Sequence, residues 1–131
     1  MRNSRIPLLI LQLTLLCGCA IDNCSTIRTD DLDGTYVYMA NPIDTIRINA
    51  KGNYSYHTFR FDKQLMNSGT WHYDSSNCRI VFADFSFLTD TMEFLNGPGH
   101  GFWSPQIRKK KNEIQLVYAT DIQKGYYLKI D

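Results

Sequence analysis

The stretch DTIRINAKGNYSYHTFRF (residues 44–61) decides the fold of this chain. Its first and last parts alternate apolar and polar residues, and the segment NAKGN (residues 49–53) between them has the composition of a turn. Gly52 can adopt the positive φ angle that such a turn needs. Because alternation with a period of two is typical of half-buried strands, the stretch predicts an antiparallel β-hairpin.

Runs of the same kind continue on both sides of this hairpin. They occupy residues 34–39, 68–74, 78–85, 102–108, 113–119 and 125–130, and turn residues separate them. No segment keeps a helical apolar period, and residues 87–95 could form one or two helical turns at most. The sequence therefore predicts one small all-β domain, an antiparallel meander of about eight strands. Eight strands can close into a barrel, but a domain of about one hundred residues also fits a partly open barrel or a sandwich.

Three motifs in this part of the chain resemble the lipocalin-like domains of small bacterial lipoproteins. They are a strand with Gly-x-Tyr (residues 34–36), the hairpin Asp-Thr-Ile-x-Ile and Gly-x-Tyr-x-Tyr (44–48 and 52–56), and a strand with Ser-Gly-Thr-Trp (68–71). The resemblance covers residues 34–85 approximately and implies a lipocalin-like barrel. It also implies that Trp71 packs inside the floor of that barrel.

The second hairpin, formed by residues 54–61 and 68–74, holds two of the three histidines. If its turn is centred between Gln64 and Leu65, His57 lies opposite His72 on the polar face of the sheet. Two histidines near a carboxylate could bind a transition metal, but strands present polar residues to solvent by default. We therefore expect a solvated histidine pair and no metal site.

The N-terminus has the features of a secretory signal: a short basic start, an apolar run over residues 6–16 and then small residues. The run is shorter than the ~20 residues that cross a bilayer as a helix. The motif Leu-Cys-Gly-Cys (residues 16–19) resembles the lipobox of bacterial lipoproteins. The resemblance implies that residues 1–18 are a signal peptide, that the chain is cut before Cys19, and that this cysteine carries diacylglycerol and an acyl chain such as palmitate.

Such lipidation would make the membrane a partner of the chain, because three acyl chains hold a domain on a bilayer far more firmly than one. Residues 19–33 would be the lipidated cysteine and a flexible polar tether, and residues 34–131 the β domain. The expected localisation is the bacterial cell envelope, with the domain in the periplasm or on the cell surface. The outer membrane is favoured over the inner membrane because Ala20, and not an aspartate, follows Cys19.

Two of the four cysteines remain free to pair after this processing, Cys24 and Cys78. Cys17 leaves with the signal peptide, and Cys19 carries lipid. In an oxidising compartment, two such cysteines tend to form a bond. We expect a Cys24–Cys78 disulfide, with two unpaired thiols as the alternative, since Cys24 lies in the expected tether.

Charge and motifs argue against several classes of function. Loss of Arg2 and Arg5 with the signal peptide reduces the 14 basic residues to 12, against 13 acidic residues, and this balance argues against a nucleic-acid partner. The chain has no G-x-S-x-G nucleophile elbow, no H-E-x-x-H motif and no glycine-rich phosphate loop. We therefore expect no catalytic residues, no cofactor and no enzymatic activity.

A connection of about 23 residues (84–106) separates two of the expected strands and is far longer than a hairpin loop. Its many apolar side chains would not stay in water, so we expect residues 87–95 to fold over the barrel mouth or an open edge, with residues 96–101 as a glycine-rich hinge. The candidate binding residues in this connection are Phe94, His100, Phe102 and Trp103. The alternative is that the segment only plugs the core.

Together, these observations favour a membrane-anchored, non-catalytic binding module. Its ligand would be a small apolar molecule or a protein, for example a secreted toxin for which the chain is an inhibitor or immunity protein. The alternative is a structural or accessory subunit of an envelope assembly. An internal cavity would favour the small ligand, whereas a filled core with an exposed apolar patch would favour a protein partner.

Overall fold

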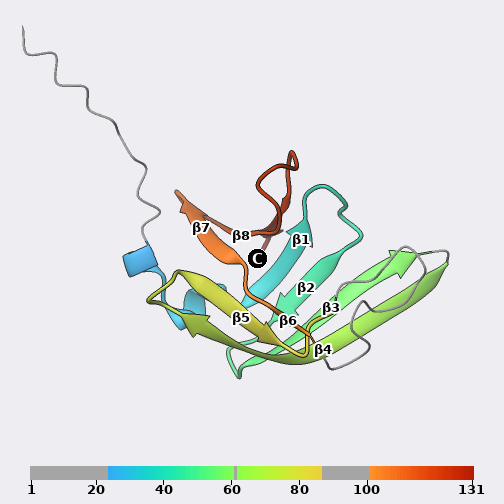
Figure 1. Ribbon diagram of the computed structural model, residues 1–131, viewed down its shortest axis with the longest axis horizontal. Coiled ribbons are helices and arrows are strands. Elements are labelled where there is room, and N and C mark those ends of the chain that lie inside the picture. Colours follow the sequence, from blue (N-terminus) through green and yellow to red (C-terminus); the bar gives the residue numbers. More distant parts are fainter. Residues whose placement is uncertain (1–23, 61, 87–100) are drawn as a thin grey trace, which may run out of the picture.

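The computed structural model describes residues 24–60, 62–86 and 101–131. These residues form nine strands and two short 3₁₀ helices (Figure 1). The helices are η1 (Cys24–Thr26) and η2 (Thr29–Leu32), and the strands are β1 (Gly34–Tyr38), β2 (Thr45–Ile48), β3 (Asn53–Arg60), β4 (Lys63–Asp74), β5 (Arg79–Ala83), β6 (Phe102–Trp103), β7 (Gln106–Lys110), β8 (Glu113–Val117) and β9 (Tyr126–Lys129). The described part contains no α-helix, and neither of its helices is long and apolar enough to cross a membrane.

Every strand pairs in antiparallel orientation, and the pairings follow the order of the chain. β1 pairs with β2, β2 with β3, β3 with β4, β4 with β5, β5 with β7, β7 with β8 and β8 with β9, and β9 returns to β1. The sheet therefore closes on itself as an eight-stranded barrel, with β6 as an extra strand on β5. This result confirms the all-β prediction, and of the arrangements that the sequence left open it selects the closed barrel.

Pro105 divides the run that the sequence predicts as one strand over residues 102–108. Its ring nitrogen carries no hydrogen, so it cannot donate to a neighbouring strand. β6 ends before this proline and β7 begins after it, and both pair with β5. The Pro105 carbonyl still accepts a hydrogen bond from the Ile80 amide at 3.3 Å. β6 and β7 therefore follow one another along the same edge of β5, with the proline between them.

Side chains from all around the barrel fill its inside. The largest fully buried ones in the described part are Tyr36, Tyr127, Phe82, Phe85, Leu32, Ile46, Ile48, Ile80, Ile107 and Leu116. Trp71, which the lipocalin-like motif assigns to the inside of a barrel, is buried in this core. Its indole N–H donates to the Asn49 carbonyl at 2.8 Å. That hydrogen bond joins β4 to the turn between β2 and β3.

The hairpin of β3 and β4 has a different register from the one that we predicted. His57 lies opposite Met66, and the pairing of the two strands extends to Arg60 and Lys63. Asp62 has a φ of 59°, a left-handed conformation that aspartate adopts more readily than most residues. His72 lies farther along β4, opposite a residue of β5, and the predicted pairing of the two histidines is wrong.

The two 3₁₀ helices pack against the barrel. Leu32 of η2 is fully buried, and Ile27, between the two helices, is 7% exposed. The Tyr36 hydroxyl donates to the Leu32 carbonyl at 3.0 Å, which joins η2 to β1. Lys129 Nζ donates to the Asp31 carbonyl at 2.8 Å, which joins η2 to β9.

The described part of the expected tether (residues 19–33) begins at Cys24. Residues 24–33 belong to the folded domain, because their two buried apolar side chains and their hydrogen bonds fix them to the barrel. Residues 19–23, with the expected lipid site Cys19, lie outside the described part of the chain.

A disulfide holds the same segment covalently. Cys24 of η1 is bonded to Cys78, directly before β5, as we predicted, and the two Cα atoms lie 5.6 Å apart. The cysteines are separated by 54 positions in the sequence. The Tyr73 hydroxyl donates to the Cys24 carbonyl at 3.3 Å and supports η1 from β4. The first described residue is therefore fixed to the barrel wall.

Removal of this disulfide should destabilise the protein. In the chain-entropy model, a crosslink that closes a loop of this length stabilises the fold by about 4 kcal/mol. We expect the Cys24→Ser/Cys78→Ser double variant to lose about that much free energy of unfolding in a urea titration. Reduction of the wild type with dithiothreitol should cause the same loss and should leave the double variant unchanged. An unchanged urea midpoint of the reduced wild type would contradict this role of the disulfide.

Candidate binding site

A cluster of aromatic side chains extends from the inside of the barrel to its surface. Its members are Tyr38, Tyr54, Tyr56, Phe82, Phe85, Trp103, Tyr118 and Tyr127. The Trp103 ring stacks on Phe82 with a centroid distance of 5.4 Å and lies 5.0 Å from Phe85. On its other side, Trp103 meets the edge of Tyr118 at 6.2 Å. These rings hold one another in place and fill this part of the barrel.

A surface hollow of about 410 Å³ lies beside Trp103 and Tyr118, and we refer to it as the Trp103–Tyr118 hollow. One wall is the junction of β6 and β7, and the other is the end of β8 with the first residues of the β8–β9 connection (residues 118–125). The polar side chains that line it are Arg79, Ser104, Gln106, Thr120 and Asp121. The hollow therefore combines aromatic surface with hydrogen-bonding groups.

The polar groups on the β6–β7 side are held in place by the sheet. Arg79 and Gln106 are register partners and form the residue pair that joins β5 to β7. Arg79 Nη1 donates to the Ser104 carbonyl at 2.7 Å. One end of the guanidinium is thus fixed, while the residue as a whole is exposed.

The β8–β9 connection, which carries the other wall, is closed by its own backbone. The amides of Tyr118 and Ala119 both donate to the Gly125 carbonyl at 2.9 Å, and the Gly125 amide donates to the Ile122 carbonyl at 2.9 Å. A Cβ atom on Gly125 would lie 2.4 Å from the Ala119 carbonyl oxygen, so the close approach requires glycine. The connection therefore presents Tyr118 and its neighbours from a defined backbone.

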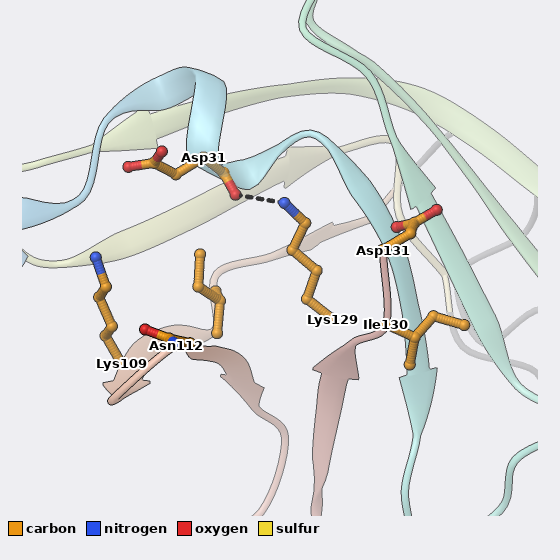
Figure 2. A pocket seen from close by; sticks show the side chains of 7 residues that line it. Asp31, Lys109, Asn112, Lys129, Ile130 and Asp131 are labelled. Carbon is orange, nitrogen blue, oxygen red and sulfur yellow. Dashed lines mark hydrogen bonds between the residues drawn. The ribbon is translucent and has the colours of Figure 1, made fainter.

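A second hollow, of about 450 Å³, lies between η2, the end of β9 and the β7–β8 turn (Figure 2). Its lining includes Asp31, Lys109, Lys129 and Asp131. Figure 2 shows Lys129 reaching the Asp31 carbonyl, to which its Nζ donates. Because this hollow is the place where η2 is fastened to the barrel, we assign it a structural role.

The structure describes two of the four candidate binding residues that the sequence indicated. Phe94 and His100 lie outside the described residues, as do the expected lid (87–95) and most of the expected hinge. Phe102 and Trp103 are adjacent on β6 and have different surroundings: Phe102 is 78% exposed, whereas Trp103 packs into the aromatic cluster and lines the hollow.

Sequence reasoning did not identify Tyr118, Arg79 or Asp121 as site residues. Tyr118 follows β8 directly and belongs to an alternating run that reads as the interior of a strand. The exposed position of its ring depends on the connection that turns back after it. No spacing in the sequence indicates that this connection meets the β6–β7 junction.

No protein-family model, curated protein or solved structure matches the chain. Among residues 24–60, 62–86 and 101–131, no group of three or more His, Cys, Asp or Glu side chains is placed to hold a metal ion. The assignment of a function therefore rests on the geometry of the hollow and on the sequence motifs.

Burial changes the protonation of several tyrosines in the core. It raises the pKa of Tyr36, Tyr54 and Tyr127 above the ordinary value of 10.0, because a buried phenolate would lose its hydration. The pKa of Asp131 is lowered, first by the hydrogen bond that the Thr35 amide donates to its carboxylate. None of these four groups lines the Trp103–Tyr118 hollow, so their shifts concern the stability of the fold.

The tyrosine pKa values predict a loss of stability at alkaline pH. The unfolded chain ionises its phenols near pH 10, whereas the folded barrel keeps Tyr36, Tyr54 and Tyr127 neutral at that pH. Their contribution to stability is therefore complete below about pH 10 and is lost as the pH rises above it. We expect the urea midpoint to fall above about pH 10, and phenolate absorbance of the buried rings to rise only as the barrel unfolds. Full ionisation of all tyrosines with an unchanged circular dichroism spectrum would contradict this expectation.

Proposed function

We propose that this chain is a lipid-anchored lipoprotein of the bacterial cell envelope and that its barrel is a non-catalytic binding module. The observation that carries the binding part is the combination of a filled barrel interior with the Trp103–Tyr118 hollow at the surface. The lipobox-like motif at residues 16–19 supports the anchor. Ala20 after the lipidated Cys19 favours the outer membrane, with the domain in the periplasm or on the cell surface.

Binding at the surface follows from how the barrel is packed. Large aromatic side chains occupy the interior, where a ligand-binding barrel of this size would keep a cavity for one small molecule. The Trp103–Tyr118 hollow has a volume of about 410 Å³, within the usual range of small-molecule sites. Its two aromatic walls are held by neighbouring rings, so little side-chain freedom is lost when a ligand binds.

The chemistry of the hollow supports a role without catalysis. The described residues that line it include one carboxylate, Asp121, one guanidinium, Arg79, and no histidine or cysteine. Arg79 already donates to a backbone carbonyl, which favours a positioning role for its charge. Groups of this kind bind and orient a ligand, and none of them forms a nucleophile–base pair.

A second candidate function, an accessory subunit of an envelope assembly, is favoured by a different surface. The hairpin of β3 and β4 continues beyond the end of β2, since β3 pairs with β2 only up to His57 but with β4 along its whole length (Figure 1). Phe59 in this part and Met66, opposite His57 at its beginning, are large apolar side chains that are 47% and 57% exposed. Exposed apolar groups of this size are typical of protein contacts.

The anchor can be tested by labelling with a fatty-acid analogue in cells. We expect the wild type to incorporate the label and Cys19→Ser to remain an unlabelled, uncleaved precursor, because the thiol that receives diacylglycerol is lost. Cys17→Ser is the matched control and should be labelled like the wild type, since this residue is removed with the signal peptide. A labelled Cys19→Ser variant would place the lipid elsewhere and contradict the lipobox assignment.

The binding module can be tested by hydrogen exchange on the detergent-solubilised full chain with and without envelope extract. We expect the extract to slow exchange of amides in residues 103–108 and 118–126, which form the two walls of the hollow. Protection of residues 58–66 alone would instead support the accessory subunit, which docks through the hairpin. An extract that protects neither segment would contradict a binding function for the barrel.

A further inference from the structure

We propose that the Trp103–Tyr118 hollow binds a neutral sugar ring, so that the ligand of the module is an uncharged glycan. This inference rests on the proposed function, for which it names the class of ligand. A sugar ring has apolar C–H faces and a border of hydroxyl groups. A site for such a ring needs a fixed aromatic surface and, beside it, groups that both donate and accept hydrogen bonds.

Tyr118 supplies the fixed aromatic surface. The residue is 42% exposed, yet its ring forms T-shaped pairs with two others, Tyr38 at 5.5 Å with an interplanar angle of 73° and Trp103 at 6.2 Å with an angle of 64°. The backbone of the connection that begins at Tyr118 is closed by the hydrogen bonds to Gly125. An exposed aromatic ring that cannot turn away can pack against C–H groups at a low entropic cost.

The polar groups of the hollow match a ring of hydroxyls. Arg79 can only donate, Asp121 can only accept, and Gln106 and Thr120 can do both. A hydroxyl is itself a donor and an acceptor, so it can pair with any of these four side chains. Hydrogen bonds with one charged partner are stronger than those between neutral groups. The hollow offers a positively charged donor, Arg79, and a negatively charged acceptor, Asp121.

The charges of the hollow also select against other ligands. Arg79 and Asp121 carry opposite charges, so a phosphate or an acidic peptide would meet a carboxylate, and a basic peptide would meet a guanidinium. A purely apolar ligand would cover the polar groups without pairing them, which is unfavourable. A neutral, hydroxyl-rich ring avoids both costs.

The test is isothermal titration of the full-length protein with neutral trisaccharides of glucose, mannose and N-acetylglucosamine. The protein is solubilised in a polyoxyethylene detergent, because the sugar headgroups of glycoside detergents would compete with the trisaccharides for the hollow. We expect saturable binding of at least one trisaccharide and at least a tenfold loss of affinity in Tyr118→Ala. Phe59→Ala is the matched control, since it removes an exposed aromatic ring from a different surface, and it should bind like the wild type. Asp121→Ala, a change at an exposed residue, should weaken binding as well and serves if Tyr118→Ala does not fold.

Three results would overturn the inference. They are the absence of binding by every trisaccharide, equal affinity of the wild type and both hollow variants, and displacement of the sugar by inorganic phosphate. Failure here is distinguishable from failure of the proposed function. If envelope extract still slows hydrogen exchange in residues 103–108 and 118–126, the module binds a ligand of another class and only the sugar assignment is lost.

Discussion

The junction between β5 and β7 is the constraint on which the rest of the molecule depends, because it closes the barrel with few contacts. One register pair, Arg79 with Gln106, joins the two strands in the described part, and the Ile107 amide adds a hydrogen bond to the Cys78 carbonyl at 2.8 Å. Cys78 is also bonded to Cys24, so the disulfide reinforces the place where the sheet is weakest. The same register pair lines the candidate hollow, and closure of the barrel and formation of the site are therefore one event.

Buried tyrosines in the core form hydrogen bonds that hold neighbouring elements of the barrel in place. A buried phenol needs a hydrogen-bond partner, and the partners here belong to other elements. The Tyr36 hydroxyl binds the Leu32 carbonyl of η2, and the Tyr54 hydroxyl donates to the Ala83 carbonyl at the end of β5 at 2.9 Å. The interior thus supplies both apolar contacts and specific attachment points, which phenylalanine could not do.

The sequence was sufficient for the parts of the structure that depend on local pattern. Alternation predicted the strands, and the two cysteines outside the lipobox-like motif, Cys24 and Cys78, predicted the disulfide. The register of the β3–β4 hairpin was not predictable with the same rules, because the choice of turn depended on Asp62 taking a left-handed conformation. The sequence indicated one wall of the hollow, because Trp103 is a large apolar residue in a long connection. It did not indicate Tyr118 on the other wall, because the contact between the two residues depends on how the barrel closes.

The disulfide also determines how far the proposed lipoprotein can stand from its membrane. Four residues (20–23) separate Cys19, the proposed lipid site, from Cys24, which is bonded to Cys78 of the barrel. Five Cα–Cα steps span about 18 Å at full extension. With a lipid on Cys19, as we propose, the barrel would therefore stay close to the lipid headgroups. Reduction of the disulfide would release η1 at most, because the buried side chains of Ile27 and Leu32 still hold the residues that follow it.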